Sequence, residues 1–192
     1  MNSLVDPNQV RFIGENSFLR LKDSAAGPDT TVCAHWRCLY SPAGGGHALF
    51  VQSRAIDDQV KVFSDNPKLV RFVQQIEALF RPFFAAPELP IVEAVFSREG
   101  DYRSAYSEIA ESAEGRIQVT WRDLGEPFQI AIPPGSEMTG SWGVYSCLMP
   151  AAAGQASILG RTPGGDPYPE DMDGHPSSTS CLAWSESWVH PR

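Results

Sequence analysis

The sequence predicts a mostly β fold, in which an antiparallel meander closes into a calycin-like barrel or curls into a curved sheet. One amphipathic α-helix is expected to pack against an open end or face of that sheet. Three observations lead to this prediction. Runs that alternate apolar with polar residues recur along the chain, only one stretch has helical periodicity, and short joints rich in glycine and proline separate the runs. A barrel of about eight strands leaves no exposed sheet edge and can hold one small ligand.

Length and composition indicate one globular domain spanning residues 1–192. Hydrophobic residues make up 42% of the chain and charged residues 20%, which argues against disorder. Sixteen glycines and sixteen prolines predict many turns and loops. We expect residues 1–9 to form a flexible arm and residues 160–177 to form a long loop.

The clearest strand signal covers residues 116–132. Residues 116–122 alternate polar with apolar side chains, and Trp121 lies on the apolar face. The alternation resumes over residues 128–132, after five residues that include Gly125. Two such runs with a short glycine-containing joint predict a β-hairpin.

Shorter alternating runs predict the remaining strands of the sheet. Residues 10–21 are expected to form a bent or broken strand pair, and residues 143–149 and 155–159 a second pair. Other strands are predicted over residues 31–40, 47–54, 59–63, 91–98, 103–111 and 178–189.

One segment has the period of an amphipathic helix. Asp65 or Asn66 can cap its start, and Pro67 suits the first helical position, where no N–H is needed. Apolar residues from Leu69 onward follow the spacing of a single stripe. Pro82 ends the regular turns, because its ring clashes with the preceding carbonyl groups.

Charge excludes some classes of partner. Fifteen basic and 23 acidic side chains give a formal charge of −8, which repels the phosphates of nucleic acids and anionic membranes. No window approaches the roughly 18 uninterrupted apolar residues of a membrane span. The first residues resemble no signal peptide, and the four cysteines are scattered, so we expect a cytoplasmic protein with reduced thiols.

We expect neither a metal nor a cofactor. The four histidines include no closely spaced ligand pair, and residues 171–174 match only the first half of an EF-hand calcium loop. The glycines at 44–46 lack the Lys-Ser/Thr ending of a phosphate loop, and no GxGxxG turn follows a strand.

Glu186 is the first candidate for a catalytic role. In a regular strand it shares a face with Trp184 and Trp188, so its carboxylate would lie on an aromatic surface. Burial there raises a carboxyl pKa toward neutrality, which suits a general acid or base. The alternative is that this face points outward, or that Glu186 pairs with Arg37 or Arg122.

Glu93 is the second catalytic candidate, because it shares strand parity with the apolar residues beside it. Tyr106 and Glu108 lie on one face of the next strand, so a polar cluster across paired strands is possible. The same pattern also suits a solvated face. His35 is expected to face solvent if Trp36 is core, although a barrel with a polar interior would invert that assignment.

These features lead to a functional expectation. We expect the protein to bind a small apolar or aromatic organic molecule in a cavity between sheet and helix, with cofactor-free, isomerase- or lyase-like chemistry as an extension. The expected aromatic wall consists of Trp36, Tyr106, Trp121, Trp184 and Trp188. The alternatives are a non-catalytic ligand carrier, and a structural protein with a filled core that forms a homodimer through the helix.

Overall fold

The fold is described by a computed structural model that covers residues 9–190, so the predicted arm lies outside the described residues except for Gln9. The main strands are β1 (Val10–Leu21), β2 (Thr31–Tyr40), β3 (Gly46–Ser53), β4 (Val60–Ser64), β5 (Ile91–Gly100), β6 (Ala105–Ser112), β7 (Gly115–Leu124), β8 (Phe128–Ile132), β9 (Gly143–Ile158) and β12 (Ser180–Val189). One α-helix, α1 (Pro67–Phe80), lies between β4 and β5.

Nine strands close into a barrel, which confirms the predicted fold class. The strands pair in the order β12-β1-β2-β3-β4-β5-β6-β7-β9, and β9 pairs back onto β12. Strand β9 closes the ring because its first half, to Pro150, pairs with β12 and its second half, from Ala151, pairs with β7. Closure satisfies the backbone groups that an open sheet would leave exposed at its edges.

The barrel is mixed rather than wholly antiparallel. Strand β4 pairs in parallel with β5, with Val62 opposite Ile91. Parallel neighbours need a crossover connection, and α1 supplies it. Helix α1, which joins β4 to β5, therefore accounts for the parallel pairing of these two strands.

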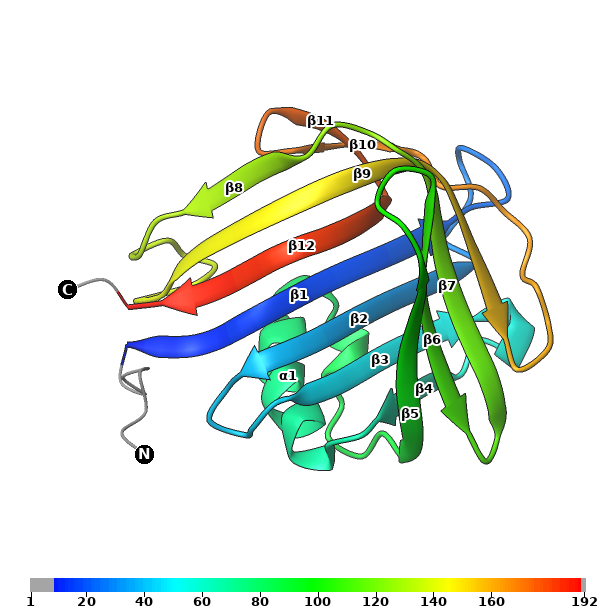
Figure 1. Cartoon of the computed structure of the whole chain (residues 1–192), viewed down its shortest axis with the longest axis horizontal. Coiled ribbons are helices and arrows are strands. Elements are labelled where there is room, and N and C mark those ends of the chain that lie inside the picture. The colour runs from blue at the N-terminus through cyan, green and yellow to red at the C-terminus, as the bar shows by residue number, and fades with distance from the viewer. Residues whose placement is uncertain (1–8, 191–192) are drawn as a thin grey trace.

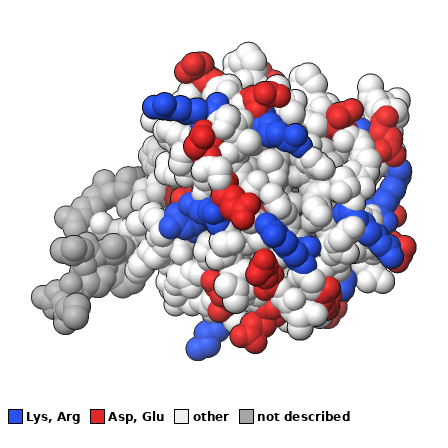
Figure 2. Space-filling view, turned by 45° about the vertical axis from the view of Figure 1, so that its right-hand side comes forward, with Lys and Arg blue, Asp and Glu red and all other residues white. Residues whose placement is uncertain are grey.

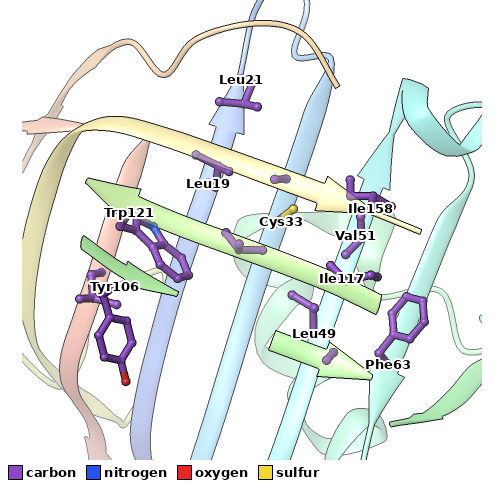
Figure 3. Packing of buried hydrophobic residues seen from close by; sticks show 14 of the residues in the cluster. Leu19, Leu21, Cys33, Leu49, Val51, Phe63, Tyr106, Ile117, Trp121 and Ile158 are labelled. Atoms are coloured by element: carbon purple, nitrogen blue, oxygen red, sulfur yellow. The ribbon is translucent and has the colours of Figure 1, made fainter. Parts of the chain in front are cut away.

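The interior of the barrel is an apolar core between two crossed layers of strands. Strands β5, β6 and β7 run steeply across β1, β2 and β3, as in an orthogonal packing (Figure 1). Leu19 and Val51 from one layer meet Ile117 and Trp121 from the other (Figure 3). The Trp121 indole also donates a hydrogen bond to the Phe18 carbonyl oxygen at 3.0 Å.

Helix α1 begins as the sequence predicts and packs against a face of the sheet, the outer one. Asn66 is the N-cap, its side chain accepts from the amides of Lys68 and Leu69, and Pro67 follows. The apolar stripe of the helix packs on residues such as Trp36 and Phe50. Helix α1 lies on the side of β1–β3 away from β5–β7 (Figure 1). The helix thus covers the outer wall of the barrel and closes neither an open end nor a concave face.

The hairpin predicted over residues 116–132 is wrong. Strands β7 and β8 both pair antiparallel with β9, Leu124 opposite Ala151 and Phe128 opposite Leu148, so they run in the same direction along one edge. The amide of Gly125 donates to the Pro150 carbonyl oxygen at 2.7 Å, which carries the ladder across the break. Alternation identified both strands, but it does not identify the partner of either.

Two other expectations differ in the same way. Strand β1 is continuous, with its irregularities absorbed by register shifts, and residues 143–158 form one long strand instead of a pair. The region predicted as a long loop contains a small hairpin of β10 (Pro169–Met172) and β11 (His175–Ser178).

Candidate functional site

The five aromatic residues expected to form one wall lie on different sides of the barrel. Tyr106 and Trp121 are in the interior core, whereas Trp36 and Trp188 are buried in the layer under α1. Trp184 is 45% exposed and meets the Tyr102 ring edge-on. No single cavity is therefore lined by all five.

A bulge in β12 explains why the tryptophans of this strand have different surroundings. Ala183 pairs with Leu148 and Ser185 with Cys147, so Trp184 has no partner on β9. The extra residue reverses the side on which the following side chains lie. Leu182 packs in the interior core, whereas Glu186 and Trp188 lie on the outer wall. The prediction that Glu186 shares a face with Trp184 is thus wrong. The prediction that it shares a face with Trp188 is confirmed.

Glu186 is a buried carboxyl group with neutral hydrogen-bond donors. It is 6% exposed. Trp188 Nε1 donates to its Oε1 at 2.7 Å, and Ser146 Oγ donates to its Oε2 at 3.3 Å. Burial raises the pKa of Glu186 to about 7, although both hydrogen bonds act in the opposite direction. The alternative partners are engaged elsewhere, because Arg37 binds Glu15 and Arg122 binds Gln155.

Glu186 lies in a pocket of about 290 Å³ on the outer wall, which we call the Glu186 groove. The groove runs between the C-terminal end of α1 and strands β1, β8, β9, β10 and β12. Its apolar lining outweighs its polar lining. The residues are Asn16, Phe18, Arg20, Phe80, Arg81, Ile130, Ile132, Val144, Ser146, Leu148, Glu170, Met172 and Glu186.

A second buried carboxylate supports the end of the groove. Glu77 is fully buried and binds Arg81 through two contacts, of 2.7 Å to Nε and 2.9 Å to Nη2. Trp36 Nε1 donates to the same carboxylate at 2.5 Å. This pairing holds the Arg81 guanidinium in place where the chain leaves α1 and enters the groove lining.

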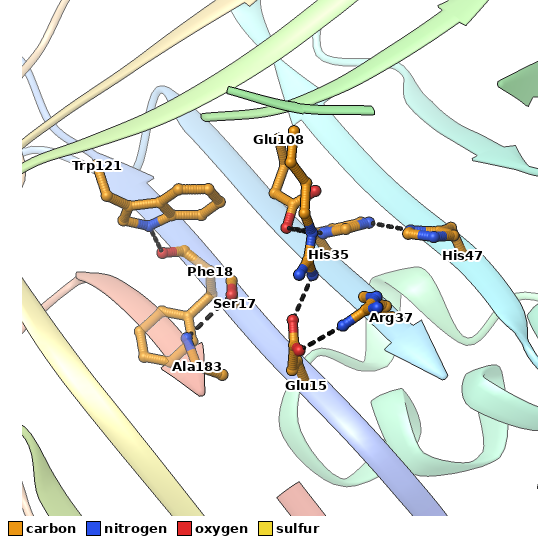
Figure 4. Close-up of polar contacts among 10 residues, drawn as sticks. Glu15, Ser17, Phe18, His35, Arg37, His47, Glu108, Trp121 and Ala183 are labelled. Atoms are coloured by element: carbon orange, nitrogen blue, oxygen red, sulfur yellow. Dashed lines mark hydrogen bonds and ion pairs between the residues drawn. The ribbon is translucent and has the colours of Figure 1, made fainter. Parts of the chain in front are cut away.

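A separate set of charged residues lies inside the barrel, and we call it the interior cluster: Glu15, His35, Arg37, His47, Arg98 and Glu108 (Figure 4). Arg98 links two carboxylates, since it contacts Glu15 and approaches Glu108 Oε1 at 2.7 Å. Burial raises the pKa of Glu108 to about 8. Glu15 and both arginines form ion pairs within the cluster, whereas Glu108 Oε2 has no hydrogen-bond partner among residues 9–190.

His35 belongs to this interior cluster and is buried, so it does not face solvent. This is the alternative that we expected for a barrel with a polar interior. His35 Nε2 lies 3.2 Å from His47 Nδ1, and both rings stack on Phe96. Burial lowers the pKa of both histidines, so they are neutral near pH 7.

Glu93 does not join Glu186. It is exposed on β5, opposite Ser64 of β4. At least three strands separate β5 from β12 in either direction around the barrel. The two catalytic candidates therefore cannot act on one bound molecule.

Charges on one face of the surface are dispersed. On the face shown in Figure 2, basic side chains lie among acidic ones, with no patch of one sign. Among the described residues, no three His, Cys, Asp or Glu side chains come together in a way that could hold a metal ion. The helices within residues 9–190 are too short or too polar to cross a bilayer.

Comparisons with protein-family models, curated proteins and solved structures found no match to this chain. Function must therefore be argued from the side chains of the groove.

Apart from Glu186, the polar residues of the groove were not predicted as site residues, and three of them differ in the signal that they give. Asn16 lies mid-strand, where asparagine is disfavoured, and that is a weak signal of a special role. Arg81 follows Glu77 by four residues, the spacing of a helical ion pair. Ser146 carries no signal, because only the pairing of β9 with β12 places it opposite Glu186.

Proposed function

We propose that the Glu186 groove binds a small, largely apolar organic molecule that makes a hydrogen bond with Glu186. The observation that carries this proposal is a carboxyl group, 6% exposed, lining a mainly apolar pocket of about 290 Å³. Ligand pockets typically combine such an apolar lining with a few polar groups that fix orientation. Phe18, Phe80 and Leu148 supply the apolar surface.

Binding can be tested with N-phenyl-1-naphthylamine, an uncharged dye whose emission rises in apolar surroundings. We expect saturable binding to the wild-type protein. Ile132→Trp and Leu148→Trp should each abolish it, because both residues line the groove and the added ring fills it. Two variants at different positions guard against one that fails to fold.

Val95→Trp is the matched control, because Val95 is 73% exposed on β5 and lies outside the groove. It should bind the dye as the wild type does. Dye binding that survives both groove-filling variants in folded protein would refute the proposal.

Proton transfer at this carboxyl group is the second candidate function. A group with a pKa of about 7 can both release and accept a proton near neutral pH, which is the property of a general acid–base catalyst. The test is incubation in D₂O with a panel of small aryl ketones, followed by NMR. Deuterium should enter the carbon next to the carbonyl with the wild-type protein and not with Glu186→Gln. Dye binding without any such exchange would favour the carrier over the enzyme.

A further inference from the structure

The charges that line the groove do not balance. Arg20 is paired with Glu170, and Arg81 is paired with Glu77. Both cations of the lining are thereby neutralised. Among the described residues, Glu186 receives hydrogen bonds only from the neutral groups of Trp188 and Ser146. An ionised Glu186 therefore leaves one uncompensated negative charge in the groove, and buried charges are stable only when they are paired.

The groove also holds two hydrogen-bond acceptors at this end that lack good donors. Asn16 is 8% exposed, and its buried Oδ1 has no hydrogen-bond partner in the part of the chain that the structure describes. Within residues 9–190 the donor to Glu186 Oε2 is Ser146, at the long distance of 3.3 Å.

The two acceptors belong to neighbouring strands. Gly14 of β1 is the residue opposite Glu186, and Asn16 follows it by two positions on β1. Both Asn16 and Glu186 line the groove. A buried acceptor without a hydrogen bond destabilises the protein. A bound molecule that supplies donors here therefore gains binding free energy from these hydrogen bonds in addition to its apolar contacts.

We propose that the Glu186 groove selects a hydrophobic amine in its protonated form, with the ammonium group donating to Glu186 and Asn16. This inference rests on the proposed function, since it names the class of molecule that the groove binds. An ammonium group brings three N–H donors and the missing positive charge, whereas an alcohol brings one donor and no charge. A carboxylate would add a second negative charge beside Glu186.

The rest of the groove suits the apolar part of such an amine. Phe18 and Phe80 lie in the lining, and aromatic faces attract cations as well as apolar chains. Arg81 would repel the ammonium group if it were free, but Glu77 holds it through two contacts.

The test compares three molecules of one shape at pH 8: 4-phenylbutylamine, 4-phenyl-1-butanol and 4-phenylbutyrate. Each is titrated into the full-length protein by calorimetry and by displacement of N-phenyl-1-naphthylamine. A charge-assisted hydrogen bond should make the amine bind at least about tenfold more tightly than the alcohol. The carboxylate should bind more weakly than either.

Variants assign the preference to its residues. In Glu186→Gln the amine should lose its advantage over the alcohol, because glutamine keeps a hydrogen-bond acceptor but carries no charge. Asn16→Leu should weaken the amine more than the alcohol. Glu93→Gln removes an equally charged but exposed side chain and should change none of the affinities.

The outcomes separate the two proposals. If the alcohol binds as tightly as the amine, or if Glu186→Gln keeps the preference for the amine, the amine inference is wrong and the groove still binds apolar molecules. The same holds if the dye binds and the amine fails to displace it. If neither the dye nor any of the three molecules binds, the proposed function itself fails.

Discussion

Replacing Glu186 by glutamine should remove a pH dependence of stability that comes from one buried carboxyl group. In the unfolded chain this group titrates near its ordinary value of 4.5, and in the folded protein burial raises its pKa to about 7. Between these values the unfolded state loses its proton while the folded state keeps it. The free energy of unfolding therefore falls as the pH rises through this window and is constant above it.

The size of the effect follows from the two pKa values. A difference between 4.5 and about 7 corresponds to a loss of about 3 kcal/mol of stability between pH 5 and pH 8. Glutamine does not titrate and keeps an oxygen that can accept from Trp188, so the variant should lack this loss. Glu108 titrates in both proteins, so its contribution cancels in the difference between them.

Urea unfolding at pH 5 and pH 8 measures the effect. Relative to the wild type, Glu186→Gln should gain about 3 kcal/mol on going from the lower to the higher pH. Glu93→Gln, which replaces an exposed carboxylate, should follow the wild type at both pH values. Parallel pH profiles for the wild type and Glu186→Gln would show that the carboxyl group is not buried as described.

Three further outcomes can be checked by standard methods. Arg81→Leu should cost about 3 kcal/mol or more in urea unfolding, because it strands the buried Glu77 carboxylate, and adding Glu77→Leu should recover most of the loss. Gly14→Ala should cost about 2 kcal/mol or more, because its Cβ would lie 2.1 Å from a backbone oxygen, whereas Gly125→Ala meets nothing nearer than 3.4 Å and should be milder. Trp184→Phe should remove most of the fluorescence that acrylamide quenches, because this indole is 45% exposed, and unchanged quenching would contradict that exposure.

The features predicted well depend on local sequence. Asn66, Pro67 and the apolar stripe define α1 without reference to the rest of the chain, since capping and periodicity act over a few residues. Alternation likewise located most of the strands. The number of short strands predicted a barrel or a curved sheet, and the pairing of β9 with β12 shows that the sheet closes.

Partnership between strands was not predictable in the same way. Residues 116–132 contain two real strands, but both pair with β9 and neither pairs with the other. The joint at Gly125 has the composition of a turn, but the chain does not reverse there. It separates two strands, β7 and β8, that pair one after the other with β9. Composition constrains the backbone angles of a joint, whereas the available partner decides whether the chain reverses there.

The candidate site shows the same limit. Parity along β12 predicted that Glu186 lies on an aromatic face, and Trp188 does share its face. The bulge at Trp184 places the residues before it and after it on opposite sides of the barrel wall, and no signal in the sequence marks it. The catalytic role of Glu186 remains a proposal to be tested at the groove.

By itself the sequence determined the β-rich class, the helix with its cap, and the choice of Glu186 as a carboxyl group on an apolar strand. Tertiary structure alone decided that α1 covers the outer wall, and that Asn16, Ser146 and Arg81 meet Glu186 in one groove. The physical reason is the separation along the chain over which each effect acts. Backbone preference and side-chain alternation are properties of neighbours in the chain, whereas burial, charge balance and unmade hydrogen bonds arise only when distant strands are brought together.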